Sequence, residues 1–359
     1  MAFCLFDKLL KRGLISGIYP ESVEYRIKLK ELLSNGPRTV YTGFDATASS
    51  LHIGNLATLI NLLHLQRHGH QVICVIGDAT TLVGDPAGRS KERQRFGDKS
   101  VIDQNASNIE QTLNKLFKNF NSCFPETKVN LKSSILQPII VRNSLWYSDK
   151  NVVDFVGDVF REVRVGGLLH KKSIQERLQS REGMNMSEFC YQIFQAYDWL
   201  ELRRRYNCQL QIGGADQGGN IYTGHDLIKK RLRQTDSIGL LAPLITSGKT
   251  GKKLGKSTDK SSSSIWLREE QTSPFDLYQF FHRTPDCDVE KFLKVFSFYE
   301  EEVIADLIEN YLKKPDDIWF CQHKLAEHAC MLVHGKEGLD IARRKTNELF
   351  PSSRKIKSI

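Results

Sequence analysis

The chain has no apolar run that approaches the roughly 18 to 20 residues needed to cross a bilayer. Its first residues, MAFCLFDKLL, lack the cleavage pattern of a secretory signal. Its eight cysteines are scattered and form no CxxC pair, so neither a zinc site nor a disulfide framework is indicated. These absences predict a soluble protein of a reducing, intracellular compartment, with no membrane partner and no protein-bound metal.

The composition is otherwise that of an ordinary globular protein. The chain has 359 residues, of which 40% are hydrophobic and 26% charged, which is enough for about two domains. Acidic residues are in the minority: 51 Lys and Arg stand against 42 Asp and Glu, a net charge of +9. This excess suits a polyanionic partner, although charge alone leaves a solvated basic surface equally open.

A strand–helix–strand unit is predicted near the N-terminus. RTVYTGF (38–44) has the β-branched and aromatic content of a strand, and GNLATLINLLHLQRHG (54–69) repeats its apolar residues at helical spacing. QVICVIGD (71–78) is a continuous apolar run, typical of a strand buried in a parallel sheet. The pattern predicts a right-handed βαβ unit.

Three polar stretches then point to a nucleotide. HIGN (52–55) opens the predicted helix, where N–H groups and the positive end of the dipole face ligands. IGGADQGGN (212–220) follows a strand-like segment, and GKTGKKLGKSTDKSSSS (248–264) is basic and rich in Gly and Ser. Taken singly, each has a plain alternative: a surface His with a helix-end Asn, a glycine turn, and a lysine-rich linker.

In this order and spacing, the three stretches resemble the signatures of a class I aminoacyl-tRNA synthetase. The intervening residues resemble the tyrosyl-tRNA synthetases of the bacterial and mitochondrial type, over about 8–350. The stretches that support this likeness are VYTGFDATASSLHIGNL, GDATTLVGDPAGRSKER, FCYQIFQAYDWL, LQIGGADQGGNI, KKLGKS, TSPFDLYQFF and LVHGKEGLDIARR.

The resemblance implies an α/β fold: a Rossmann-type parallel-sheet catalytic domain with a connective insertion, followed by a small α-helical domain. We expect the catalytic domain over 1–245, with the insertion and its dimer interface at about 122–181. A mobile KLGKS linker would cover 246–272, an anticodon-side helical domain 273–350, and a basic tail 351–359.

Such enzymes normally continue into an RNA-binding module resembling ribosomal protein S4, which PSSRKIKSI (351–359) is too short to supply. We therefore expect a truncated or isoform product, or a branch without the module.

The implied reaction joins L-tyrosine and ATP into tyrosyl-adenylate with release of pyrophosphate, and then transfers tyrosine to tRNA(Tyr). Mg²⁺ would accompany ATP as part of the substrate. Because a carboxylate is already a competent nucleophile, the enzyme is expected to act through positioning and charge stabilisation. By resemblance, the phosphate contacts and catalytic groups fall on Thr47, His52, Arg89, Arg93, Lys253, Lys256 and Ser257. The ATP-binding residues by the same resemblance are Asp45, Thr47, His52, Asn55, Gly214, Asp216 and Lys256.

The resemblance also assigns a tyrosine pocket. Tyr41 and Asp198 would recognise the phenol hydroxyl, Gln217 would lie near the carboxylate, and the ammonium would be held by Asp85, Tyr191 and Gln195. The residue spacing agrees independently, since steps of four and three place Tyr191, Gln195 and Asp198 on one helical face. Tyr197 is interpreted as an aromatic core residue.

The sequence departs from the commonest family form at three places. Gly218 stands where a large apolar residue is usual, which is expected to loosen the turn or leave a gap. Asn55 replaces a second His, and Leu254 with Gly255 replaces Met-Ser. Because Asn also donates hydrogen bonds and Gly adds loop mobility, we expect activity to survive.

Two alternatives stay open at this point. A tryptophanyl-type enzyme would share the nucleotide motifs without needing Tyr41 and Asp198 together, and a synthetase-derived RNA-binding or splicing cofactor would lack catalysis. The expected assembly is a homodimer. The expected location is the mitochondrial matrix, with a bacterial-type cytoplasm as the alternative.

Overall fold

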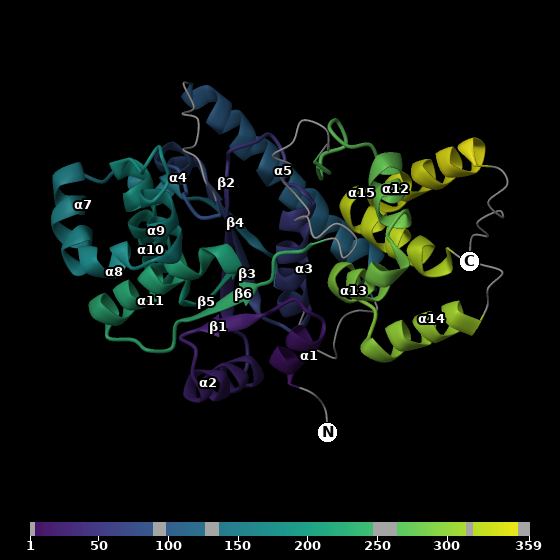
Figure 1. The fold of residues 1–359 in the computed structure, drawn as a ribbon, viewed down its shortest axis with the longest axis horizontal. Helices are drawn as coiled ribbons and strands as arrows, with labels where there is room; N and C mark the ends of the chain where they lie inside the picture. Colours follow the sequence, from purple (N-terminus) through teal and green to yellow (C-terminus); the bar gives the residue numbers. More distant parts are fainter. Residues whose placement is uncertain (1–3, 89–97, 126–135, 247–263, 314–318, 351–359) are drawn as a thin grey trace. The chain divides into compact units, whose positions relative to one another are not determined.

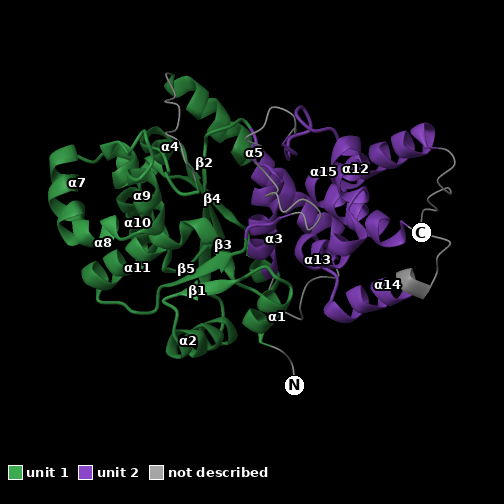
Figure 2. Cartoon of the chain, in the orientation of Figure 1, with its two compact units in different colours: residues 1–49, 65–110, 131–243 green, residues 50–64, 111–130, 244–359 purple. Residues whose placement is uncertain are grey.

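The structure is a computed structural model that describes residues 4–88, 98–125, 136–246, 264–313 and 319–350. The chain forms two compact units, drawn in green and purple in Figure 2. The first unit comprises 1–49, 65–110 and 131–243, and the second comprises 50–64, 111–130 and 244–359. The domain boundaries expected from the sequence stay predictions.

The first unit is built on a six-stranded sheet (Figure 1). Its strands are β1 (Gly17–Tyr19), β2 (Thr39–Asp45), β3 (Gln71–Gly77), β4 (Ile139–Arg142), β5 (Cys208–Gly214) and β6 (Ile238–Ala242). Their order is β1-β6-β5-β2-β3-β4, and only the β1–β6 pairing is antiparallel among these strands. The predicted α/β class with a mostly parallel sheet is confirmed.

The predicted strand–helix–strand unit corresponds to β2, α3 (Ile53–Arg67) and β3. β2 pairs with β3 in parallel, from Thr39 opposite Gln71 to Asp45 opposite Gly77. Every residue of β3 after the first is buried, which explains why its sequence is a continuous apolar run rather than an alternating one.

The order of the strands reverses between β2 and β5. From β2 the chain proceeds outward through β3 to β4, whereas β5 and β6 extend the sheet the other way. In open parallel sheets, ligands bind beyond the carboxyl ends of the strands at such a reversal. The ends of β2 and β5, at Asp45 and Gly214, therefore mark the place to look for a site.

Helices complete the first unit. They are α1 (Leu5–Lys11), α2 (Val23–Ser34), α4 (Asp78–Val83), α6 (Ser144–Tyr147), α7 (Val152–Val159), α8 (Val165–Leu169), α9 (Lys172–Leu178), α10 (Met186–Tyr206) and α11 (Gly218–Leu232), with the short 3₁₀ turns η2 (Phe160–Glu162) and η3 (Ala215–Gln217). The long helix α10 starts where the Asn185 side chain accepts a hydrogen bond from the Glu188 amide and ends at Asn207, whose φ of 49° is left-handed. α10 packs on α11 closely enough that Gly224 lies against the Trp199 ring.

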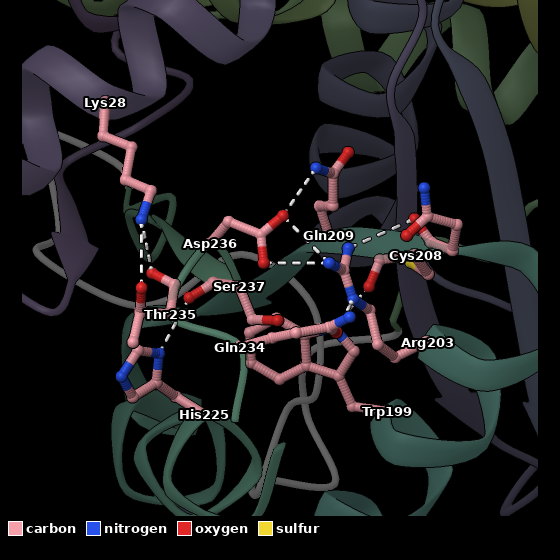
Figure 3. A network of polar contacts seen from close by, with 11 residues as sticks. Lys28, Trp199, Arg203, Cys208, Gln209, His225, Gln234, Thr235, Asp236 and Ser237 are labelled. Atoms are coloured by element: carbon pink, nitrogen blue, oxygen red, sulfur yellow. Dashed lines mark hydrogen bonds and ion pairs between the residues drawn. The ribbon is translucent and has the colours of Figure 1, made fainter. Parts of the chain in front are cut away.

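A partly buried ion pair fixes the loop that follows α11 (Figure 3). Arg203 of α10 donates from Nη2 to both carboxylate oxygens of Asp236, at 2.8 and 2.9 Å, and from Nε to Gln234. Gln209 of β5 donates to the same carboxylate at 2.8 Å, and Lys28 of α2 donates to the carbonyl oxygen of Thr235 at 2.9 Å. These contacts join α2, α10 and β5 to the loop that follows α11.

The second unit is helical. It contains α12 (Pro274–His282), α13 (Asp286–Phe296), α14 (Glu301–Lys313) and α15 (Phe320–Leu349), and it receives most of α3 and the end of α5 (Lys99–Cys123). Ser273 caps α12 through the Asp276 amide, and Pro274 occupies its first turn. α15 bends at Gly335, which has a φ of 78°. Within the described residues, no helix combines the length and apolar character needed to cross a membrane.

Candidate active site

Asp198 of α10 is a buried carboxylate, with 5% of its surface exposed. Trp146 Nε1 and Tyr147 Oη donate to its Oδ1 at 2.8 and 2.9 Å, and Asn143 Nδ2 donates to its Oδ2 at 3.1 Å. Burial raises the pKa of Asp198 to about 7, although these three hydrogen bonds act in the opposite direction. A carboxylate offers about four acceptor positions, so the donors among the described residues leave one position on Oδ2 for a further donor.

Tyr41 lies on β2 and is fully enclosed, with its ring 6.1 Å from that of Trp199. Among the residues that the structure describes, none accepts a hydrogen bond from its buried hydroxyl. Burial, and then the charge of Asp198, raise the pKa of Tyr41 well above its usual value, so the phenol keeps its proton. A buried donor without an acceptor is uncommon and costs about 1–3 kcal/mol, which is a reason to expect a ligand here.

A second group of side chains is linked through one amide. Asp85 accepts from Gln217 Nε2 at 2.7 Å and from Asn220 Nδ2 at 3.4 Å. The Asn220 amide also reaches the Oε1 atoms of Gln195 and Gln217, both at 2.9 Å. The structure therefore brings together three of the residues predicted from the sequence, Asp85, Gln195 and Gln217, with their oxygens turned to a common donor.

Tyr191 and Asp45 are joined directly. The Tyr191 hydroxyl donates to Asp45 Oδ1 at 3.1 Å, and the same oxygen accepts from Thr80 Oγ1 at 3.0 Å. Gly77 packs so tightly here that a Cβ atom would lie 2.5 Å from Asp45 Oδ1. Because the single proton of Tyr191 is given to Asp45, the phenol oxygen can itself accept from a cation.

His52 immediately precedes α3, in the second unit. Its backbone N–H donates to Asn55 Oδ1 at 3.0 Å, and its Nδ1 accepts from the Gly54 N–H at 3.1 Å. A neutral imidazole that accepts at Nδ1 must carry its proton on Nε2, so His52 presents an N–H donor. The segment is held by a short antiparallel bridge to Trp266, whose ring centroid lies 6.3 Å from that of His52.

Asp216 and Gly214 lie where β5 passes into α11. Gly214 precedes the turn η3, which contains Asp216. Gly88, with a φ of 67°, lies beside this carboxylate, since a Cβ atom there would be 2.8 Å from Asp216 Oδ2. Any larger residue at Gly88 would therefore meet both backbone strain and the carboxylate.

The remaining predicted site residues divide into two groups. Thr47 forms a tight turn after β2, where its N–H donates to the Asp45 carbonyl oxygen at 2.8 Å. The others, Arg89, Arg93, Lys253, Lys256 and Ser257, lie outside the described residues.

Sequence reasoning missed the residues that hold the predicted ones in place. They are Thr80, Asn143, Trp146, Tyr147 and Asn220. A signal was available for Asn143, because it lies just after the apolar residues IIV of β4, and polar residues at the carboxyl ends of parallel strands gather at the ligand edge. Within the described part of the chain, no group of three or more His, Cys, Asp or Glu residues is arranged for a metal ion.

Comparison with known proteins gives consistent results. A family model described as "tRNA synthetases class I (W and Y)" matches residues 33–351. The mitochondrial tyrosine–tRNA ligase of Drosophila melanogaster is 45% identical over 343 residues, covering 96% of this chain and 72% of the relative. The human mitochondrial counterpart is 43% identical over 346 residues, covering 95% and 70%. The crystal structure of a C-terminally truncated mitochondrial tyrosyl-tRNA synthetase from Aspergillus nidulans superposes with a TM-score of 0.83 at 30% identity, covering 97% of this chain and 94% of that one.

Proposed function

Because the chain belongs to the class I tRNA synthetases of the tryptophan and tyrosine family, we propose that it is a tyrosine–tRNA ligase. ATP is a substrate of every member of this class. In the first step a carboxylate oxygen of tyrosine attacks the α-phosphorus of ATP, the α–β bridging bond breaks, and pyrophosphate leaves with the electron pair. In the second step a hydroxyl of the terminal ribose of tRNA(Tyr) attacks the acyl carbon, and AMP leaves.

The pairing of Tyr41 with Asp198 supports tyrosine as the substrate most directly. Tyr41 has a buried hydroxyl with no acceptor among the described residues, and Asp198 has one acceptor position open. A substrate phenol would satisfy both, by accepting from Tyr41 and donating to Asp198 Oδ2. A phenylalanine side chain would satisfy neither, and an indole N–H could donate to Asp198 but could not accept from Tyr41.

The ammonium and carboxylate of tyrosine are assigned to the linked amide group. The oxygens of Asp85, Gln195 and Tyr191 are acceptors, as an ammonium requires. Gln217 is assigned to the carboxylate, because its Nε2 donor is already oriented by Asp85 at 2.7 Å. These contacts would fix the nucleophile, and catalysis by positioning depends on such restraint.

The ATP contacts are assigned by the motifs and by local geometry. His52 would donate from Nε2–H to the departing pyrophosphate, together with Thr47, and Asn55 would donate to the ribose from its NH₂ group. Asp216, with the close backbone at Gly214, would accept from the ribose hydroxyls. Asp45 is assigned to the same nucleotide.

The cationic groups are assigned by sequence alone. The side chains that would neutralise the charge developing on pyrophosphate are Arg89, Arg93, Lys253 and Lys256, and the neutral Ser257 hydroxyl would donate a hydrogen bond to the same group. Cations that reach this group chiefly in the transition state raise the catalytic rate more than the affinity for ATP. Mg²⁺ would enter bound to the phosphates of ATP.

We also propose a homodimer formed through α7. Val152, Val153 and Val156 are exposed to 71%, 73% and 45%, whereas Phe155 and Val159 of the same helix are buried. An exposed cluster of three valines on one short helix is typical of a surface that a partner covers. A Val153→Asp variant should elute as a monomer, while the parent chain elutes as a dimer.

The mitochondrial matrix is the proposed location, because both animal relatives are named as mitochondrial enzymes. Fractionation of cells that express a tagged full-length protein would test this, with protection from added protease as the criterion for the matrix.

Amino-acid-dependent exchange of pyrophosphate into ATP tests the proposed activity. Tyrosine should support exchange, whereas phenylalanine and tryptophan should not. Exchange with tryptophan instead would indicate a tryptophanyl enzyme. Binding of RNA without exchange by any amino acid would indicate a non-catalytic RNA-binding protein.

A further inference from the structure

Tyr147 belongs to the short helix α6, and its hydroxyl contacts the carboxylate of Asp198 on α10. Its Oη lies 2.9 Å from Asp198 Oδ1 and 2.9 Å from the carbonyl oxygen of Phe194. Its ring packs at centroid distances of 5.9 Å from Phe155 on α7, and 5.7 Å from both Phe194 and Tyr197 on α10. The hydroxyl is therefore held in place by aromatic side chains of two helices.

The single proton of this phenol belongs on the bond to Asp198. Both of its polar neighbours are acceptors, so it can donate fully to only one of them. The Phe194 carbonyl lies inside α10, where helical carbonyls already accept from the amide four residues later. An ionised carboxylate is also the stronger acceptor.

The two carboxylate oxygens of Asp198 then differ in the number of hydrogen bonds they accept. Trp146 and Tyr147 fill both positions on Oδ1, and Asn143 fills one on Oδ2. The position that remains is on Oδ2. Without the Tyr147 hydroxyl, Oδ1 would have an open position too, and a substrate hydroxyl would have two places to bind.

We propose that Tyr147 is a positioning residue that sharpens specificity for tyrosine, because its hydroxyl closes Oδ1 of Asp198, directs the substrate phenol to Oδ2 and stabilises the ionised carboxylate. This inference rests on the proposed function, since it requires Asp198 to be the acceptor of the substrate phenol.

Besides burial, the nearby charge of Asp45 opposes the ionisation of Asp198. Asp45 and Tyr41 face it from β2, and Tyr191 lies near Tyr147 on the same helix as Asp198. Burial and Asp45 raise the pKa of Asp198, whereas Trp146, Asn143 and Tyr147 lower it by hydrogen bonding. Removing one of three donors therefore raises the pKa of Asp198 further.

The test compares Tyr147→Phe with Tyr197→Phe. Tyr197 is a neighbouring ring in the same aromatic group, but its hydroxyl is bonded to Glu201, so it serves as a matched control. Tyrosine-dependent pyrophosphate exchange is measured across the neutral pH range with both variants and the parent chain.

For Tyr147→Phe, the acidic limb of the kcat/KM profile for tyrosine should move up by about one pH unit. KM for tyrosine at neutral pH should rise about tenfold with kcat nearly unchanged, and discrimination against phenylalanine should fall. Tyr197→Phe should keep the parent profile.

Two results would overturn the inference. One is an unchanged profile and unchanged discrimination in Tyr147→Phe. The other is a loss of kcat/KM that is equal at every pH and accompanied by a lower Tm, which would show that the hydroxyl serves only packing. An Asp198→Asn arm separates this inference from the proposed function. If Asp198→Asn still recognises tyrosine, the proposed site is wrong; if it does not, while Tyr147→Phe behaves as the parent, only the role of Tyr147 is wrong.

Discussion

At Asp198, the demands of recognition and of stability oppose each other. Burial raises the pKa of this carboxyl from 3.8 to about 7, so the folded chain holds its proton more tightly than the unfolded chain. The stability contributed by the protonated form is complete below pH 3.8 and is lost as the pH rises through about 7. Recognition of a phenol requires the ionised form, which is the less stable one.

The Asp198→Asn variant should expose this conflict. Relative to the parent chain, its Tm should improve as the pH is raised from about 5 to about 8, because the asparagine never ionises. Tyrosine-dependent exchange should be lost. Thermal melts at several pH values measure the effect, and the informative quantity is the change with pH rather than the absolute difference.

Asp236→Asn is the matched control for that experiment. Burial of Asp236 acts to raise its pKa, but hydrogen bonding from Gln209 and the charge of Arg203 prevail, and its pKa lies below the usual value. Its contribution to stability is therefore present throughout the range above about pH 5. A similar pH dependence in both variants would contradict the assignment to Asp198.

Tyr41→Phe should separate stability from substrate binding in a different way. Removing a buried hydroxyl that has no acceptor among the described residues should leave the Tm unchanged or slightly raised without substrate. The rise in Tm on adding tyrosine should be smaller than in the parent, and discrimination against phenylalanine should be modestly poorer. A variant that lost stability without substrate but kept the full response to tyrosine would show that the hydroxyl has a structural partner instead.

Spacing along one helix was enough to predict which side chains share a face, but not what holds them. Tyr191, Gln195 and Asp198 were predicted together, and all three lie on α10. The donors Asn143, Trp146 and Tyr147 come from a segment about fifty residues earlier, and they reach Asp198 only because β4 joins the sheet. Helical periodicity carries no information about such tertiary contacts.

On the scale of elements, α11 contains a pair of glycines with opposite surroundings. Gly218 has helical dihedrals, and the nearest atom to an added Cβ would be Leu241 Cδ2 at 4.0 Å. At Gly224 an added Cβ would lie 2.7 Å from Cε3 of Trp199, a ring with no exposed surface. The sequence expectation that Gly218 loosens the turn stays a prediction, but its backbone does not require glycine.

Alanine at these two positions should therefore have opposite effects. Gly218→Ala should stabilise the protein by about 0.4–1 kcal/mol, because alanine restricts the unfolded chain without strain in the helix. Gly224→Ala should destabilise it by about 1–3 kcal/mol, because α10 and α11 would be forced apart. Denaturant titrations of both variants measure the difference. Equal effects would mean that α11 packs on α10 less tightly than the contact between Gly224 and the Trp199 ring implies.

The elements themselves were predictable where their sequence pattern was strong. The apolar run of β3 and the helical repeat of α3 gave the βαβ unit nearly to its ends. β4 was not predicted, because it has only four residues, all half-buried, within the segment expected to form an insertion. The bend of α15 at Gly335 was not predicted either, since one glycine in a helical pattern does not distinguish a bend from a tolerated residue.

On the scale of the whole molecule, a local pattern does not reveal which core an element joins. α3 reads as one continuous helix with apolar residues at helical spacing, yet 53–64 belong to the second unit and 65–67 to the first. α5 is divided in the same manner after Glu110. The reversal of strand order around the site was not predicted, because no periodicity in this sequence expresses the order of strands in a sheet.

The net charge of +9 is also a property of the whole molecule, and its use in binding tRNA depends on which cations are available. The carboxyl end of α11 provides two adjacent lysines with different surroundings. Lys229 is exposed, whereas Lys230 donates to Asp226 at 2.7 Å and to the carbonyl oxygen of Glu162 at 2.8 Å. Counterions are released from the nucleic acid when a protein cation neutralises a phosphate. A lysine that is already paired with a carboxylate contributes less to this release.

Lys229→Gln should therefore weaken binding of tRNA(Tyr) and reduce the slope of log affinity against log salt by about 0.7–0.9. Lys230→Gln, which removes the same formal charge, should change the slope by much less, because Lys230 is already paired with Asp226 and its loss removes no phosphate contact. Fluorescence titrations of labelled tRNA over a salt series measure both slopes, and tyrosine-dependent pyrophosphate exchange should be unaffected in either variant. If the two slopes fell equally, the loss would follow net charge alone, and the end of α11 would have no specific place in the binding of tRNA.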